Sequence, residues 1–305
     1  MENRDLSLEI ERQGYILEDS QSSCVQSIYP INRVLWSGSS QYCDKLLICE
    51  SDNYGKMLFT DGELQSCDFD ERIYHEFLVH PIVSIYCSLY MKRELRVLVL
   101  GGGEGSTIRE LLKYPMDIIS EIVWIDIDKD LVRLCRENLK YCDESIYEDS
   151  RVNLRFDDAN KFLDENKNDG VKFDILICDL PDPYINNSSG LYSLKFWSDM
   201  KKNLNENGLI VSHLGPLNGE RCNYNLCNDL ISELKLSVEN YKLGKVFIPS
   251  FISEWLYLIF SMDDNIRDVC LESINLPNNL EILDTKSLLN FFYFPNYYRK
   301  FIFGL

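Results

Sequence analysis

The chain of 305 residues is long enough for one large core and a smaller satellite domain, since 45% of its residues are hydrophobic. Its 31 basic and 49 acidic side chains give a formal net charge of −18, and such a surface repels nucleic acid and attracts small cations. No apolar run approaches the ~18 residues that a membrane span needs, and the N-terminus is too charged for a secretory signal. We therefore expect a cytoplasmic protein that binds neither nucleic acid nor a membrane.

The eleven cysteines form no C-x-x-C pair, and several stand inside apolar runs such as "ILICDL". This pattern indicates buried thiols and gives no sign of a zinc site or a disulfide framework. We accordingly expect no bound metal.

The first ninety residues differ in pattern from the rest of the chain. Residues 44–66 alternate short apolar runs with the turn sequences "DNYG" and "TDGE", which favour β-hairpins. The apolar spacing becomes helical over residues 71–90. We predict an N-terminal domain of antiparallel β-hairpins with a linking helix over residues 1–90, and a second, larger domain over residues 91–305.

Apolar strands alternate with helical stretches in the larger domain. This order predicts an α/β fold, in which a parallel sheet is covered by helices on both faces. The connection between the last two strands is too short for a crossover, so we expect an antiparallel hairpin at the sheet edge. The seven predicted strands cover residues 96–101, 121–127, 152–156, 173–180, 208–215, 242–248 and 254–262.

The segments that follow the first two strands are typical of a nucleotide site. Gly101 and Gly103 belong to a glycine loop that permits close approach of the backbone to a ligand, and Glu104 follows them. Asp126 stands 25 positions beyond Gly101, where a carboxylate accepts both hydroxyls of a ribose. Together these features favour an adenosine-type ligand.

Two further strands are also followed by acids. Asp158 stands after the third strand, from where a carboxylate reaches an adenine amino group, and Asp179 and Asp182 flank Pro181 after the fourth. Each acid has a plainer explanation, as a helix N-terminal carboxylate or part of a proline-fixed turn. Four acidic motifs at one sheet edge would nevertheless repel one another unless a cationic ligand lies among them. The pattern indicates a sulfonium nucleoside that carries an amine.

Several motifs, in order and spacing, resemble the polyamine aminopropyltransferases, the family of spermidine, spermine and thermospermine synthases. The resemblance covers residues 34–262 and implies a Rossmann-like, methyltransferase-type catalytic domain with a small N-terminal β domain. It also implies a homodimer, and decarboxylated S-adenosylmethionine as co-substrate with no separate cofactor. The motifs are "GGGEGSTIREL", "IDID", "FDILICDLPDP", "LYSLKFW", "GLIVSHLGP" and "IPSF", preceded by "ESDNYGKMLFTDGELQSCDFDERIYHE".

The resemblance assigns roles on the donor side. Gly101 and Glu104 match the donor loop, whose acid holds the amine of the aminopropyl chain, while Asp126 matches the ribose ligand and Asp158 the adenine ligand. Cys43 stands where the family usually has a donor-binding glutamine. Because a thiol is a poor substitute for an amide, we expect weaker donor binding or compensation by another residue.

On the acceptor side, Asp179 matches the general base, and Tyr74 and Asp182 match residues that hold the acceptor amine. A base is needed because a protonated amine cannot attack carbon, and the displacement releases methylthioadenosine. His75 could donate a hydrogen bond to either ligand or simply pack within its helix. Phe251 and Trp255 line an acceptor tunnel in one interpretation and pack in the core in the other.

The acceptor is predicted from finer details. "GGGEGST", "LGP" and "PSF" followed by tryptophan resemble thermospermine synthases, so spermidine is favoured, giving thermospermine or spermine. Phe251 also lacks the hydroxyl that suits the far ammonium of a short diamine. Three alternatives stay open: a spermidine synthase that uses putrescine, an S-adenosylmethionine-dependent methyltransferase, and a catalytically silent polyamine-binding relative.

Overall fold

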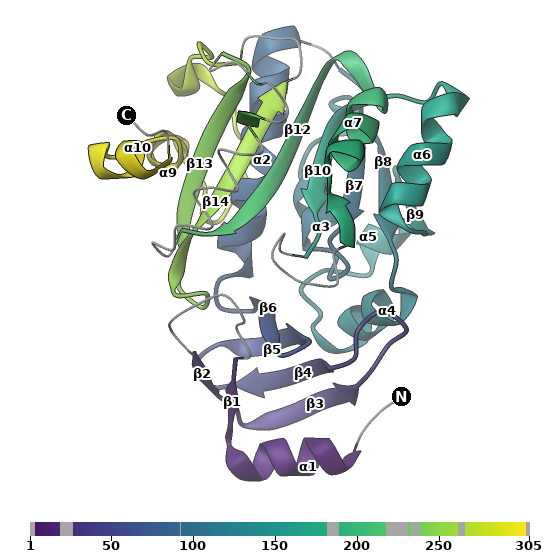
Figure 1. Cartoon of the computed structure of the whole chain (residues 1–305), viewed down its shortest axis with the longest axis vertical. Helices are drawn as coiled ribbons and strands as arrows, with labels where there is room; N and C mark the ends of the chain where they lie inside the picture. Colours follow the sequence, from purple (N-terminus) through teal and green to yellow (C-terminus); the bar gives the residue numbers. More distant parts are fainter. Residues whose placement is uncertain are drawn as a thin grey trace.

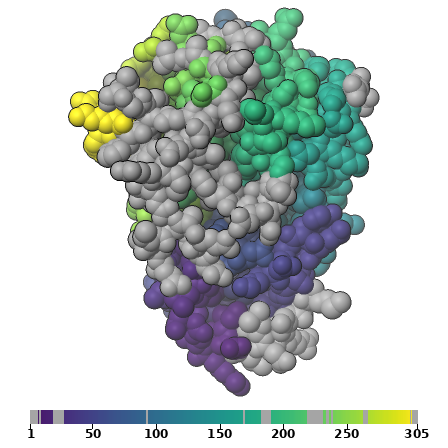
Figure 2. Space-filling model, in the orientation of Figure 1, coloured from purple at the N-terminus to yellow at the C-terminus, as the bar shows by residue number. Residues whose placement is uncertain are grey.

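The computed structural model describes residues 4–18, 27–91, 93–181, 189–217, 231–232, 236, 239–261 and 266–302. Asp182 and most of the polar loop around it lie outside these residues. The described segments form a small N-terminal β unit and a large sheet covered by helices (Figure 1). The N-terminal residues lie at one end of the molecule (Figures 1 and 2). None of the helices in these segments combines the length and apolar character that crossing a membrane requires.

The N-terminal unit is built from antiparallel strands, as predicted. In its last hairpin Thr60 pairs with Glu63, and the two residues between them, Asp61 and Gly62, both have positive φ, at 51° and 91°. Such a two-residue turn follows the right-handed twist of its strands, which is why "DG" favours it. The elements are α1 (Arg4–Gln13), the pair β1 (Tyr15–Leu17) and β2 (Ile28–Pro30), and the four-stranded sheet of β3 (Arg33–Gly38), β4 (Leu46–Ser51), β5 (Gly55–Thr60) and β6 (Glu63–Cys67).

Helix α2 (Glu71–Tyr90) joins the two units. It begins directly after the small sheet, runs along the large one and packs against α3 (Ser106–Leu112) and β12 (Leu204–Pro216) (Figure 1). It ends where Met91 turns into the left-handed region at φ 48°. The helix is therefore the element that carries side chains from the small unit to the edge of the large sheet. The predicted domain boundary at residue 90 stays a prediction.

The large sheet has the order β13-β14-β12-β10-β7-β8-β9 in the described residues. Five strands are parallel, and β14 pairs antiparallel with both β12 and β13. The predicted antiparallel pair is confirmed, with β13 as the edge strand and β14 inserted beside β12. The strands are β7 (Leu95–Gly101), β8 (Ile119–Asp126), β9 (Val152–Phe156), β10 (Phe173–Asp179), β12 (Leu204–Pro216), β13 (Tyr241–Ile248) and β14 (Ser253–Ser261), with a separate short β11 (Ser189–Tyr192).

Side chains of the central strands alternate between two cores. Val97 and Val99 of β7 lie in the core under α2 and α3, whereas Leu98 and Leu100 lie in the core under α6 and α7. Both faces are thus apolar, which explains the continuous hydrophobic runs of the buried parallel strands. The remaining helices are α3 (Ser106–Leu112), α4 (Lys129–Asn138), α5 (Ser145–Glu148), α6 (Ala159–Asp169), α7 (Leu194–Lys202), η1 (Leu271–Ser273), α9 (Thr285–Phe291) and α10 (Asn296–Ile302).

Candidate active site

The glycine loop after β7 packs directly on the end of β10. A Cβ at Gly101 would lie 2.0 Å from the backbone oxygen of Asp179, and Gly101 has φ 83°. The Gly102 N–H donates to the same oxygen at 2.9 Å, while the indole N–H of buried Trp124 donates to the Gly101 carbonyl at 2.8 Å. Any side chain at Gly101 would force the loop away from Asp179, so the glycine is required for this approach.

Asp179 is the last residue of β10, and two hydroxyl groups hold its carboxylate. Tyr74 on α2 donates to Oδ1 at 2.9 Å, and Thr107 at the start of α3 donates to Oδ2 at 2.6 Å. Both oxygens are therefore fixed in direction, and the side chain remains partly exposed. A carboxylate held in this way is a suitable proton acceptor for a substrate amine within hydrogen-bond reach. Thr107 lies inside the motif "GGGEGSTIREL", but sequence reasoning gave it no role.

Asp126, at the end of β8, is nearly buried. Burial, opposed by a hydrogen bond from the Asp128 backbone N–H and assisted by the negative charges of Asp128, Asp179 and Glu104, raises its pKa to about 7. That N–H donates to Oδ1 at 2.8 Å. A Cβ at Gly103 would lie 3.0 Å from Oδ2, so the glycine loop leaves this oxygen little room. The mutual repulsion that the sequence predicts among these acids is therefore present in the fold.

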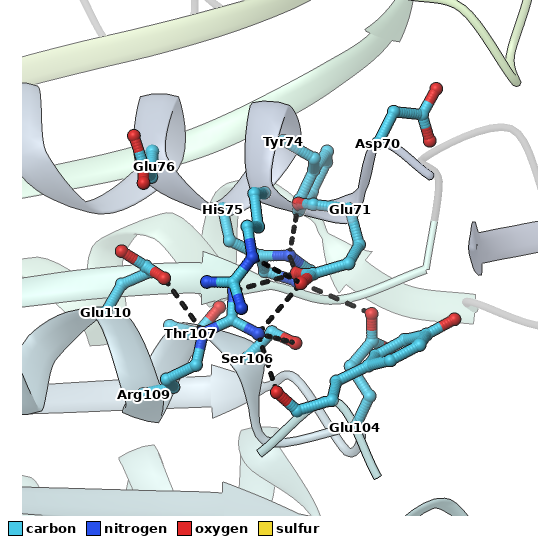
Figure 3. A network of polar contacts seen from close by, with 12 residues as sticks. Asp70, Glu71, Tyr74, His75, Glu76, Glu104, Ser106, Thr107, Arg109 and Glu110 are labelled. Carbon is cyan, nitrogen blue, oxygen red and sulfur yellow. Dashed lines mark hydrogen bonds and ion pairs between the residues drawn. The ribbon is translucent and has the colours of Figure 1, made fainter. Parts of the chain in front are cut away.

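Glu104 is the acid of the glycine loop, and His75 is its cationic partner. His75 Nε2 lies 3.5 Å from Glu104 Oε1, and His75 Nδ1 lies 2.9 Å from Glu71 Oε2 (Figure 3). Burial alone would lower the pKa of His75, but hydrogen bonds to Glu104 and Glu71 raise it to about 10. His75 therefore carries a charge, which goes beyond either sequence interpretation of this residue.

Three rings beside Tyr74 form what we call the aromatic wall: His213, Trp255 and Phe251. The rings of Tyr74 and His213 have their centroids 5.8 Å apart, His213 stacks on Trp255 at 6.2 Å, and Trp255 contacts Phe251 at 4.7 Å. Phe251 and Trp255 are both partly exposed and both packed against apolar clusters, and their role in an acceptor tunnel stays a prediction. His213 was missed because it lies inside strand β12, near its carboxyl end, whereas the acids were sought after the strands.

His213 also ties the wall to the segment after Asp179. Its Nε2 lies 2.6 Å from the Leu180 carbonyl, and its Nδ1 lies 3.4 Å from the indole N–H of Trp255. A carbonyl can only accept and an indole can only donate, so these two contacts fit a ring with its hydrogen on Nε2. The wall and the end of β10 are thereby held together.

Two predicted donor residues have other contacts in the fold. Asp158 is the N-cap of α6 and accepts from the Lys161 N–H at 3.0 Å, which leaves one carboxylate oxygen outside this bond. Its neighbour Asp157 donates its backbone N–H to the Asp126 carbonyl at 3.1 Å, so the segment adjoins the acidic cluster. The adenine role of Asp158 stays a prediction.

Cys43 is buried between the small sheet and α4. It packs with Leu134 and Cys135, its thiol lies 3.6 Å from Asp61 Oδ1, and burial raises its pKa to about 12. The same loop reaches the segment after β8 through Ser40, whose hydroxyl donates to Asp128. Whether Cys43 itself binds a donor stays a prediction.

Known proteins share both the fold and its sequence motifs. The solved structure of a spermidine synthase in complex with the transition state analogue AdoDATO has the same fold, with a TM-score of 0.82 at 22% identity over 95% of both chains. Residues 71–269 match the spermine/spermidine synthase domain, and residues 16–68 match the spermidine synthase tetramerisation domain.

Two relatives extend the match over most of the chain. The polyamine aminopropyltransferase 1 of Hyperthermus butylicus is 31% identical over 252 residues, which is 82% of each chain. The polyamine aminopropyltransferase of Sulfolobus acidocaldarius is 30% identical over 279 residues, covering 89% of this chain and 88% of its own. The chain belongs to the polyamine aminopropyltransferase family of enzymes.

Proposed function

We propose that the protein transfers the aminopropyl group of decarboxylated S-adenosylmethionine to a polyamine, with spermidine as the favoured acceptor. The observation that carries the proposal is the Asp179 carboxylate, held on one oxygen by Tyr74 and on the other by Thr107. It faces the glycine loop on one side and adjoins the aromatic wall through Tyr74 on the other. A base between a donor loop and an acceptor surface is what such a transfer needs.

On the donor side, we assign the amine of the aminopropyl chain to Glu104, the ribose to Asp126 and the adenine to Asp158. The burial that raises the pKa of Asp126 supports a ligand at this point, because ribose hydroxyls would donate hydrogen bonds to the carboxylate and stabilise its charged form. The reaction needs no cofactor beyond this co-substrate, since its positively charged sulfonium activates the aminopropyl carbon and departs as the neutral thioether.

On the acceptor side, Asp179 takes a proton from the attacking ammonium as its nitrogen lone pair forms the new bond to carbon. The carbon–sulfur bond breaks, and its electron pair leaves with methylthioadenosine. The aromatic wall then receives the rest of the chain, because aromatic faces attract alkylammonium groups. Phe251 has no hydroxyl to anchor a short diamine, which favours a triamine.

One incubation tests both the reaction and the acceptor. The protein receives decarboxylated donor with equal putrescine and spermidine, and the products are separated by chromatography. A tetraamine together with methylthioadenosine supports the proposal. If spermidine formed from putrescine is the main product, the acceptor is wrong while the reaction stands. If the protein releases no methylthioadenosine, it is a silent relative. In a parallel incubation with S-adenosylmethionine as the donor, transfer of a methyl group would indicate a methyltransferase.

We also propose that the protein is a cytoplasmic oligomer. The match of residues 16–68 to a tetramerisation domain supports the assembly of several copies of this chain. The homodimer expected from the resemblance is the smallest such oligomer. Sedimentation equilibrium distinguishes a dimer from a tetramer, and a monomer at micromolar concentration would contradict the proposal.

A further inference from the structure

A chain of buried and partly buried polar side chains leads from α3 to the glycine loop. Arg109 donates from its two terminal nitrogens to the two carboxylate oxygens of Glu71, at 2.8 and 2.9 Å (Figure 3). Its Nε donates to Glu110 at 2.9 Å, and the Tyr141 carbonyl accepts a further bond at 3.0 Å. A bidentate contact of this kind fixes the plane of the Glu71 carboxylate as well as its position.

Glu71 in turn orients the ring of His75, which lies one turn further along α2. His75 Nδ1 lies 2.9 Å from Glu71 Oε2 and 2.7 Å from the Glu71 backbone carbonyl, and both can only accept. The opposite nitrogen, Nε2, faces Glu104 Oε1 at 3.5 Å. Because both ring nitrogens face acceptors, both carry hydrogen and the ring is a cation.

We propose that Arg109 and Glu71 are positioning residues that fix the ring of His75, and through it one oxygen of Glu104. The inference rests on the proposed function in one respect, which is that Glu104 receives the amine of the donor. With one oxygen directed to His75, the other is left for that amine. Neither Arg109 nor Glu71 needs to touch a substrate.

The charges around His75 agree with this arrangement. Among the described residues it is faced by Glu71 and Tyr74 from α2 and by Glu104 from the glycine loop, while Arg109 from α3 lies behind Glu71. Burial opposes the charge of Glu71, but hydrogen bonds with His75 and Arg109 lower its pKa to about 2. The charges of two carboxylates and two cations then balance, which limits the free-energy cost of burying these groups. They are Glu71 and Glu104, and His75 and Arg109.

Histidine NMR tests the arrangement without any enzymatic assay. The chain has three histidines, so replacing each in turn assigns the spectrum. In the ligand-free wild type we expect His75 to stay protonated from about pH 6 to about pH 8.5. In Glu71→Gln the amide still accepts from Nδ1 but lacks the charge, so the pKa of His75 should fall by about one to three units.

Glu110→Gln is the matched control for this variant. It removes a buried carboxylate that also accepts from Arg109, but Glu110 lies against His80 and Lys113 and makes no contact with His75. Both variants lose a buried charge, so thermal unfolding of both reports the purely structural cost. We expect only Glu71→Gln to change the titration of His75.

Kinetics supply the second measurement. Glu71→Gln should raise the donor KM at least about tenfold and leave kcat within about threefold, because the lost carboxylate charge weakens the positioning of His75 and Glu104, which acts on donor binding. Arg109→Lys keeps the positive charge but loses the bidentate contact with Glu71, so its donor KM should rise less than that of Glu71→Gln. Since both changes act on one chain of contacts, the double variant should be no worse than Glu71→Gln alone.

The outcomes separate the two proposals. An unchanged His75 titration in Glu71→Gln, or an equal change in Glu110→Gln, overturns the positioning roles. A donor KM that rises equally in Glu71→Gln and Glu110→Gln overturns them as well. If the His75 titration moves as expected while no variant and no wild type transfers an aminopropyl group, the positioning chain stands and the proposed function fails.

Discussion

Tyr74 and Asp179 are separated by 105 residues in the sequence, and the tyrosine hydroxyl lies 2.9 Å from the aspartate oxygen. The same helix and strand make a second contact of this kind, since Tyr86 of α2 donates to Asp174 of β10 at 3.1 Å. Only the first pair lies at the carboxyl end of β10, beside the glycine loop. The second pair is therefore a natural control for experiments on the first.

Replacing Asp179 by asparagine tests the general base. Asp179→Asn keeps the size of the side chain but cannot take a proton, so we expect turnover to fall at least ~10²-fold while donor binding changes little. Single-turnover kinetics and donor calorimetry measure the two effects separately. A variant that keeps more than half of its activity would refute the assignment.

Tyr74→Phe removes one of the two hydroxyl donors to Asp179. We expect about a tenfold loss of turnover, because a hydrogen bond to a charged group contributes roughly 1.5 to 3 kcal/mol. Tyr86→Phe loses the equivalent bond to Asp174 and should show a comparable drop in thermal stability with no loss of turnover. Equal turnover in the two variants would show that the Tyr74 hydroxyl has only a structural role.

Asp126 makes stability depend on pH in a defined direction. Burial, followed by repulsion from other carboxylates, raises its pKa from 3.8 to about 7. Between these values the folded protein binds a proton that the unfolded chain has lost, so stability falls as pH rises through this window. Asp126→Asn should raise the free energy of unfolding by up to about 4 kcal/mol at about pH 8 and change it little at about pH 4.

Denaturant titrations of both proteins at the two pH values measure this difference, and the acidic measurement is the internal control. Asparagine keeps an oxygen acceptor for the Asp128 N–H, so the hydrogen bond is not lost with the charge. A stability gain of the same size at both pH values contradicts a raised pKa as its cause.

Glu104 should govern the choice between donors. We expect the decarboxylated nucleoside to bind more tightly than S-adenosylmethionine, because Glu104 and Asp179 repel the additional carboxylate of the latter. His75 offsets part of this repulsion, since it lies 3.5 Å from Glu104. Glu104→Gln should narrow the ratio of the two affinities in calorimetry. Equal affinity of the wild type for both nucleosides would refute the idea.

Phe251→Tyr tests the choice of acceptor. The added hydroxyl contributes roughly 0.5 to 1.5 kcal/mol if it meets the far ammonium of a short diamine, so use of putrescine relative to spermidine should rise about two- to tenfold. Phe247→Tyr is the control, because Phe247 belongs to the same hairpin and is 52% exposed. An identical product ratio in the two variants would leave Phe251 without a role in acceptor choice.

The fold was predictable because its signals are local. The strand runs around Val97 and Ile122 are apolar on both faces. The "DG" turn at Asp61 adopts the positive φ values that a two-residue hairpin turn requires. Parallel strands bring their carboxyl ends to one edge, so the acids that follow them could be expected to meet. Asp182 lies outside the described residues, so its role in holding the acceptor amine stays a prediction.

What the sequence determined by itself is therefore the family, the order of elements and the acids at the sheet edge, because each depends on short stretches of chain. The tertiary structure alone decided that Thr107 and Tyr74 share Asp179, that His213 joins the aromatic wall, and that Arg109 reaches His75 through Glu71. These contacts join α2, α3, β10 and β12, and their geometry depends on how helices pack on a twisted sheet. No spacing along the chain encodes that packing, since it results from the burial of both cores at once.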